Sequence, residues 1–286
     1  FFFYMIVVET IPALRREIAA LRRAGKRIAF VPTMGNLHAG HLKLVQIARQ
    51  HADVVVASIY VNPLQFGPKE DFGAYPRTPD DDKKALETEK TDLLFMPTDA
   101  EMYPRGLDVM TKVEVPALGD ILCGQFRPGH FRGVTTVVNR LFSLVQPDVA
   151  VFGKKDYQQL MLIKLMVADL GLPIEIVGVD TMREADGLAL SSRNNYLSPA
   201  ERQVAPKLYA TLRDVCDRIL KEGGVRSGIE TDTLHALETA GFRADYLSVR
   251  RAADLGEPGP QDKALVILVA AWLGRTRLID NIEVTV

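Results

Sequence analysis

Short, nearly continuous apolar runs recur along the first two thirds of the chain and constrain its fold more than any other feature. Strands covered on both faces have this composition, because neither face meets water. Segments with helical periodicity lie between several of the runs, so the pattern predicts a Rossmann-like, doubly wound parallel α/β sheet. The five runs lie at residues 27–33, 53–61, 92–97, 148–153 and 173–179. A buried helix face is predicted at Val134, Val137, Val138, Leu141, Phe142 and Val145.

The pattern changes after about residue 183, where a smaller α+β domain is predicted. Ser198 and Glu201 form a capping-box pattern with proline between them, and Ser227 with Glu230 repeats the pattern for a second helix. We therefore expect a nucleotide- and substrate-binding domain at 1–182 and a C-terminal lid domain at 183–286. Three strands are predicted to end the chain, at residues 244–250, 263–273 and 276–286, the last two joined as a hairpin.

Charge and cysteine content narrow the class of protein. The 35 Lys and Arg residues are balanced by 36 Asp and Glu residues, so no global field favours nucleic acid or an anionic membrane. The two cysteines, Cys123 and Cys216, have no metal-ligand spacing and suit a reducing compartment, which predicts a cytoplasmic localisation. The apolar opening segment is too short to act as a signal peptide or a membrane span.

The segment "VPTMGNLHAGHLKLV" at 31–45 places His38 and His41 between the end of a predicted strand and the start of a predicted helix. Such a pair could ligate a metal, contact a nucleotide phosphate or be ordinary polar residues at a strand end. Gly35 and Gly40 favour the phosphate, because they allow close approach to the unpaired N–H groups of a helix N-terminus. A zinc site is less favoured, since no third Cys or His ligand has a suggestive spacing.

A second polar segment, "READGLALSSRNNYLSP" at 183–198, carries adjacent hydroxyls at Ser191 and Ser192 followed by Arg193. Hydroxyl donors beside a permanently charged guanidinium suit a pyrophosphate leaving group. A solvated linker between domains is the alternative interpretation of the same residues. Together with the histidine pair, the segment favours nucleotide chemistry.

"HAGH" at 38–41 resembles the first signature of the HIGH-type nucleotidyltransferase superfamily, and "LSSR" at 190–193 is similar to its second signature without the usual lysine. Lys155 or Arg193 would have to supply that missing charge. Further stretches extend the resemblance over nearly the whole chain and in order, and the set resembles the pantoate–β-alanine ligase family. These stretches are "PTMGNLHAGH", "VNPLQFGPKEDF", "RPGHFRGVTTVV", "FGKKDYQQL" and "READGLALSSRN".

The resemblance implies that ATP adenylates the carboxylate of pantoate and that the amine of β-alanine then attacks the acyl adenylate, giving pantothenate, AMP and pyrophosphate. Pantoate is already ionised at neutral pH, so the first step needs charge neutralisation and alignment rather than a strong base. The implied catalytic residues are His38, His41, Lys155, Ser191, Ser192 and Arg193. The implied ATP-binding residues are Met34, Gly40, His41, Gly153, Lys155, Asp156, Leu190, Ser191 and Arg193.

Pantoate carries a carboxylate, two hydroxyls and a gem-dimethyl group, so its pocket should combine amides with apolar walls. The resemblance implies pantoate contacts from Gln65, Gln159, Asn62, Arg127 and His130, with Met34, Pro32 and Phe66 as the wall. It also makes Asp81 and Asp82 candidate ligands of the Mg²⁺ that accompanies ATP. Acidic residues at a helix start are equally explained by the helix dipole, and Asp156 could hold the ion, cap a helix or contact ribose.

The leading hypothesis is an ATP-dependent acid–amine ligase that is homodimeric, as relatives of this kind commonly are. One rival is a nucleotidyltransferase acting on a phosphorylated substrate, which would need a further cationic pocket. A tRNA-charging enzyme is disfavoured, because no anticodon-binding domain or basic surface is apparent. A regulatory module that binds a nucleotide without turnover is the alternative from another class.

Overall fold

The computed structural model describes residues 4–68 and 70–286, so the start of the apolar opening segment, residues 1–3, lies outside the described residues. The chain separates into two compact units, which are described one at a time. The first unit comprises the chain up to Lys154 together with Gln159–Asp180, and the second comprises Lys155–Gln158 and Thr181–Val286. The short 155–158 segment therefore packs with the C-terminal part of the chain, although it follows a strand of the first unit directly.

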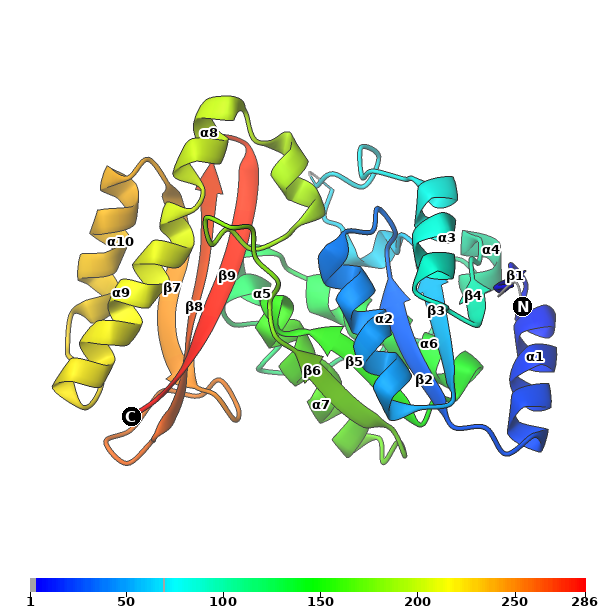
Figure 1. The fold of residues 1–286 in the computed structure, drawn as a ribbon. Helices are drawn as coiled ribbons and strands as arrows, with labels where there is room; N and C mark the ends of the chain where they lie inside the picture. The colour runs from blue at the N-terminus through cyan, green and yellow to red at the C-terminus, as the bar shows by residue number, and fades with distance from the viewer. Residues whose placement is uncertain (1–3, 69) are drawn as a thin grey trace. The chain divides into compact units, whose positions relative to one another are not determined.

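The first unit is built on a parallel sheet of six strands in the order β1-β4-β3-β2-β5-β6 (Figure 1). All five predicted strands are confirmed, and the sixth, β1, lies in the apolar opening segment and was not predicted as a strand. It pairs in parallel with β4, Val7 lying opposite Leu94. The strands are β1 (Ile6–Val8), β2 (Ile28–Thr33), β3 (Val54–Ile59), β4 (Leu93–Phe95), β5 (Val149–Gly153) and β6 (Glu175–Val179).

Helices cover both faces of this sheet, as the continuous apolar strands require. On one face, Val31 of β2 shares a core with Leu44 of α2 and Leu86 of α3. On the other, Phe30 of β2 meets the edge of Phe142 in α6, and all six predicted core positions of α6 are buried. The helices are α1 (Ile11–Arg23), α2 (Ala39–His51), α3 (Pro79–Thr88), α4 (Asp99–Met102), α5 (Cys123–Phe126), α6 (His130–Val145) and α7 (Tyr157–Asp169), with short 3₁₀ turns η1 (Pro63–Gln65) and η2 (Lys154–Asp156).

The second unit pairs a three-stranded antiparallel sheet, β7-β8-β9, with helices that bury their apolar faces on it. The three predicted strands and the hairpin between the last two are confirmed. Leu212 and Val215 of α9 and Val269 of β8 are among its fully buried core residues. The elements are η3 (Ser192–Tyr196), α8 (Pro199–Val204), α9 (Lys207–Glu222), α10 (Ile229–Thr239), β7 (Arg243–Arg251), β8 (Ala264–Leu273) and β9 (Thr276–Thr285).

The two predicted capping boxes differ in outcome. Ser198 and Glu201 cap α8 reciprocally, as predicted. The second helix, α10, is present, but Ser227 does not cap it: Gly228 occupies the N-cap position with a φ of 84°, a left-handed conformation that glycine adopts without strain. Over the described residues, no helix has both the length and the apolar composition needed to cross a membrane.

Candidate active site

The histidine pair lies at the carboxyl end of β2, where the chain turns into α2. His38 is the N-cap residue of α2, and its Nδ1 accepts a hydrogen bond from the N–H of Gly40 at 3.1 Å. His41 Nδ1 accepts from the N–H of His38 at 3.3 Å, and the two ring centroids are 4.1 Å apart. Since both Nδ1 atoms accept, the neutral form of each ring carries its proton on Nε2. The capping geometry thus sets both rings as Nε2–H donors at the N-terminus of a helix.

The loop between β2 and α2 has a backbone conformation that only certain residues tolerate. Gly35 has a φ of 79°, and a Cβ there would lie 3.0 Å from both Asp82 Oδ2 and the Ile59 side chain. Asn36 follows with a φ of 49°, a region that asparagine enters more readily than most residues. Gly35 was predicted to let a phosphate approach the backbone. The structure shows that the packing of the loop against Asp82 and Ile59 by itself already favours glycine at this position.

Asp82 holds this loop in place. Its Oδ2 accepts from the N–H of Asn36 and its Oδ1 from the N–H of Leu37, each at 2.8 Å, and Thr78 Oγ1 donates to Oδ1 at 3.1 Å. The residue is only 2% exposed. Nothing in the sequence pattern indicated this role, because Asp82 and the two loop N–H groups are more than 40 residues apart.

The predicted magnesium ligands Asp81 and Asp82 lie together in the first turn of α3. Both oxygens of Asp82 already accept hydrogen bonds from the loop, and Asp81 is exposed on α3. Among the residues that the structure describes, no cluster of three or more His, Cys, Asp or Glu side chains could hold a metal ion. Asp82 therefore supports the loop between β2 and α2 that leads to His38, here called the histidine loop.

A buried amide network follows β3, in the turn η1. Asn62 Nδ2 donates to Gln65 Oε1 at 3.2 Å and to the carbonyl of Gly133 at 3.1 Å, while Asn62 Oδ1 accepts from the hydroxyl of Tyr103 at 2.7 Å. Burial raises the pKa of Tyr103, so its hydroxyl remains a donor. Gln65 Nε2 lies 3.0 Å from the sulfur of Met34, one of the predicted wall residues. Both side-chain groups of Asn62 are thus bonded within this network, which connects η1 to α6 and to Tyr103.

Arg127 and His130 belong to a second network on the same turn. The Arg127 guanidinium binds Glu70 through two bonds of 2.7 and 2.6 Å. His130 Nε2 lies 3.0 Å from Arg127 Nη1 and His130 Nδ1 lies 2.7 Å from the carbonyl of Gln65. An arginine can only donate and a carbonyl can only accept, so the proton of His130 is on Nδ1, the opposite tautomer from His38.

The pKa of Glu70 reports the strength of this second network. Burial disfavours its charged form, but the hydrogen bonds and charge of Arg127 outweigh that effect, so the Glu70 pKa lies below its ordinary value. Arg127 and His130 were predicted as pantoate contacts, and the structure shows them bonded to Glu70 and to the Gln65 backbone. Glu70 was not predicted, because an acidic residue in a loop carries no distinguishing sequence signal.

Of the remaining candidate residues, Gly153 and Gln159 belong to the first unit and the others to the second. Gly153 ends β5, Lys155 lies in η2, and Asp156 beside it is exposed. Ser191 caps η3, where its Oγ accepts from the N–H of Arg193 at 3.3 Å. Leu190, Ser192 and Gln159 are each partly exposed. The cap gives Ser191, two residues before Arg193, a structural role of its own.

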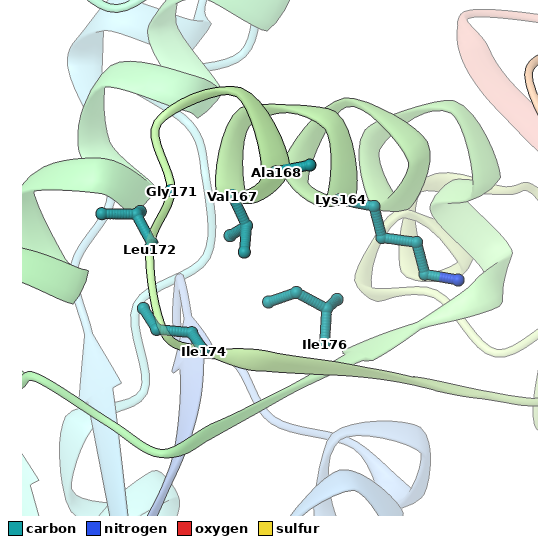
Figure 2. A pocket seen from close by; sticks show the side chains of 7 residues that line it. All are labelled: Lys164, Val167, Ala168, Gly171, Leu172, Ile174 and Ile176. Atoms are coloured by element: carbon teal, nitrogen blue, oxygen red, sulfur yellow. The ribbon is translucent and has the colours of Figure 1, made fainter.

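A pocket of about 490 Å³ lies between α7 and β6, lined mainly by apolar side chains (Figure 2). Ile174, on its rim, comes just before the amino end of β6, whereas the histidines follow the carboxyl end of β2. Ligands of doubly wound sheets bind beyond the carboxyl ends of the strands. We therefore do not assign the substrates to this pocket.

A doubly wound parallel sheet with two Nε2–H imidazoles at the helix N-terminus after an inner strand defines the class: an α/β enzyme that binds the phosphates of a nucleotide. The family model for pantoate–beta-alanine ligase matches residues 6–283. The chain is 57% identical to the pantothenate synthetase of Shewanella loihica over 279 residues, 98% of this chain and 99% of that one. It is equally identical, at 57% over 281 residues, to the pantothenate synthetase of Chromohalobacter salexigens, with the same coverage.

Solved structures agree with these sequence relatives. A crystal structure of pantothenate synthetase from Thermus thermophilus has a TM-score of 0.91 at 48% identity and covers 99% of this chain and 100% of that one. A pantoate–beta-alanine ligase from Francisella tularensis, complexed with beta-gamma ATP and beta-alanine, has a TM-score of 0.82 at 33% identity, covering 98% and 97%. The chain belongs to the pantoate–beta-alanine ligase family. It is an AMP-forming ligase that condenses pantoate with β-alanine at the expense of ATP.

Proposed function

We propose that His38 and His41 contact the phosphates of ATP and stabilise the charge that develops as the pantoate carboxylate attacks the α-phosphorus. The supporting observation is the tautomer: backbone N–H groups bond both Nδ1 atoms, so each neutral ring presents Nε2–H as a donor. Donors fixed before the reaction need no reorganisation when charge develops, which is the main source of electrostatic catalysis. The N-terminus of α2 adds its partial positive charge on the same side.

The rest of the nucleotide is proposed to be bound by residues of both units. Lys155 supplies a point charge to the phosphates, and Ser191, Ser192 and Arg193 supply hydroxyl and guanidinium donors for the departing pyrophosphate. Met34, Gly40, Gly153, Asp156 and Leu190 complete the proposed ATP contacts. Magnesium enters as part of the MgATP substrate; Asp82 is not proposed as its ligand, because both of its oxygens already accept hydrogen bonds.

For pantoate, the amides of Gln65 and Gln159 are the proposed contacts. Gln65 can donate and accept at once, which suits a substrate with hydroxyls beside a carboxylate. Asn62, Arg127 and His130 are proposed to act mainly by holding Gln65, since their polar groups already bond to that turn or to Glu70. This division of roles modifies the direct contacts suggested by the resemblance.

The reaction proceeds in two balanced steps. A pantoate carboxylate oxygen bonds to the α-phosphorus while the bond from that phosphorus to the β-phosphate bridging oxygen breaks, releasing pyrophosphate. The neutral amine of β-alanine then bonds to the acyl carbon, AMP leaves with the oxygen, and the nitrogen loses a proton. An acyl adenylate is readily hydrolysed, so the unit formed largely by residues 183–286 is proposed as a lid that excludes water.

We further propose a homodimer in the cytoplasm, as the resemblance implies. The edge strand β6 carries the partly exposed side chain of Ile176 next to the apolar pocket of Figure 2. An apolar sheet edge is an aggregation hazard unless something covers it. A second copy of the chain would serve that purpose.

The decisive experiment measures pyrophosphate release from ATP with pantoate, with and without β-alanine, for the native protein and for His41→Ala. We expect sustained turnover to AMP and pantothenate only with both substrates, and a fall of about 100-fold or more in kcat for His41→Ala, as when one preorganised donor is removed. Wild-type turnover in folded His41→Ala would remove the histidine from the mechanism. Adenylyl transfer to a phosphorylated acceptor would instead favour the nucleotidyltransferase alternative.

A further inference from the structure

Strand β9 carries two adjacent buried polar residues that bond to segments far away in the sequence, within the second unit. Asp280 is 4% exposed and Asn281 is 7% exposed. Asp280 binds the guanidinium of Arg183 through both oxygens, at 2.6 and 2.9 Å. Asn281 Nδ2 donates to the backbone carbonyl of Lys155 at 2.9 Å. Strand β9 thus binds Arg183, at the start of the segment that leads to Ser191, Ser192 and Arg193, here called the serine loop. The same strand binds the backbone of Lys155, the lysine proposed to contact the phosphates.

Strand alternation explains how neighbouring residues reach two different segments. Successive side chains of a strand point to opposite faces. Leu278 and Val284, in phase with Asp280, belong to the core beneath the helices, so Asp280 lies on that face. Asn281 lies on the other face together with Glu283, which accepts from the hydroxyl of Tyr157 at 3.1 Å. The 155–157 segment is therefore bonded to β9 at two points, two residues apart on the strand.

Arg183 connects the helix-side face of β9 to the serine loop. Besides binding Asp280, its guanidinium donates to the carbonyl of Gly187 at 3.2 Å and to that of Asn281 at 3.4 Å. It also lies 3.5 Å from the ring centroid of Tyr209 in α9. These contacts fix the chain at both ends of the tight turn that leads into Ser191.

Energetics favour a positioning role for this ion pair over a purely stabilising one. The side chains of Arg183 and Asp280 are only 17% and 3% exposed, so both charges lose most of their hydration. The attraction between two buried charges often does little more than offset that loss, and apolar residues of similar size would stabilise the unit as well. What an ion pair with two parallel hydrogen bonds supplies is a defined geometry.

We infer that Asp280 and Asn281 are positioning residues for the adenylation step. Asn281 sets the position of Lys155 through its backbone carbonyl, and Asp280 sets the loop of Ser191, Ser192 and Arg193 through Arg183. The inference rests on the proposal that Lys155 and the serine loop contact the phosphates of ATP. Its consequence is that these cationic and hydroxyl groups form one body with β9, even though Lys155 follows a strand of the first unit in sequence.

The test compares Asn281→Ala and Asp280→Asn with a matched control, Asp245→Asn. Asp245 forms another buried ion pair of the same sheet, 2.8 Å from Arg277 Nε, and its side chain is 8% exposed. We expect both β9 variants to lower kcat/KM for ATP by about 10-fold or more while leaving KM for β-alanine nearly unchanged. Asp245→Asn should lose a similar amount of thermal stability without either kinetic change. Equal kinetics in the β9 variants and the control would overturn the inference.

A double-mutant cycle with Lys155→Ala separates this inference from the proposed role of the lysine. If Asn281 acts through Lys155, Asn281→Ala should add less than about 2-fold to the loss already caused by Lys155→Ala, because coupled changes are not additive. Fully additive losses would sink the positioning role while leaving Lys155 in place. Unchanged ATP kinetics in Lys155→Ala would remove the phosphate role and the inference together. Should Asp280→Asn fail to fold, the Asn281→Ala cycle decides alone.

Discussion

Single residues in this protein act mostly through the backbone atoms that they hold. Asp82 contributes no group to the surface of the site, yet its two oxygens accept from consecutive N–H groups of the loop before His38. Glu70 similarly acts on Gln65 only through Arg127 and His130. We therefore expect the proposed chemistry to depend on carboxylates that need not touch a substrate.

Asp82→Asn tests the loop support directly. The amide has one accepting oxygen, so one N–H of the loop would face an NH₂ group, and we expect a loss of about 1–3 kcal/mol in the free energy of unfolding. Displacement of His38 should also lower kcat by about 10-fold. Thermal melts and ATP kinetics at several magnesium concentrations provide the measurement. If Asp81→Asn and Asp82→Asn instead raised the magnesium requirement alike, the pair would be a metal site after all.

Glu70 predicts a specific dependence of stability on pH. Its folded-state pKa lies below the ordinary value of 4.5, so its contribution is present above that value and is lost as the pH falls through the folded pKa. Glu70→Gln should melt below the native protein at neutral pH, and the difference should shrink at about pH 3.5. Melting curves at both pH values check this, with the exposed Glu87→Gln as control. A difference that is the same at both pH values would contradict the ion-pair explanation.

At the scale of elements, the site depends on how closely α6 approaches the turn η1. Gly133 of α6 lies against that turn, and a Cβ on it would come within 2.2 Å of the Leu64 carbonyl oxygen and 2.7 Å of Gln65 N. The same contact places the Gly133 carbonyl where Asn62 donates to it. A packing contact between backbones thus positions the amide that we propose for pantoate.

Gly133→Ala should therefore harm both stability and substrate binding. Backbone atoms cannot yield as a flexible side chain would, so we expect a loss of about 2–4 kcal/mol in the free energy of unfolding. The displaced turn should raise KM for pantoate more than KM for ATP. Denaturant unfolding and steady-state kinetics measure the two effects. Gly73→Ala is the matched control, because a Cβ at Gly73 meets nothing within 4 Å; equal effects of the two substitutions would refute the argument.

At the scale of the whole molecule, the two units divide the proposed chemistry. The histidine loop and the amide network belong to the first unit, and Lys155 with the serine loop belongs to the second. The lid proposed for the second unit rests on this division, because an acyl adenylate must be kept from water. The proposed homodimer is a second property of the whole molecule.

The homodimer proposal predicts a specific response to a charge on the sheet edge. Ile176→Lys would place a charge in the lining of the apolar pocket at β6, and a lysine on an edge strand disfavours pairing with another chain. We expect the native protein to sediment as a dimer and Ile176→Lys to shift toward monomer, as measured by analytical ultracentrifugation. A monomeric native protein would dismiss the dimer, and a dimeric Ile176→Lys would place its interface elsewhere.

Local patterns in the sequence determined the sheet, the helices and the residue types of the site. Five of six parallel strands, the three C-terminal strands and the buried face of α6 follow from apolar periodicity, which depends only on neighbouring residues. The strand β1 was missed because its apolar residues lie in the opening segment, which was considered only as a signal peptide or a membrane span. Ser227 failed as a cap because Gly228 could take the left-handed position itself. The histidine pair was recognisable since its glycines and its helix start lie within a few residues.

Only the tertiary structure decided which side chains hold the site together. Asp82 meets the histidine loop across more than 40 residues, Glu70 meets Arg127 across 57, and Asn281 meets Lys155 across 126. In each case the residue type is ordinary at its own position, so a single sequence offers no reason to select it. For Asp82 and Asn281, the role arises when the fold brings a buried side chain to a backbone group that needs a partner, and for Glu70 when it brings the Arg127 guanidinium to the carboxylate.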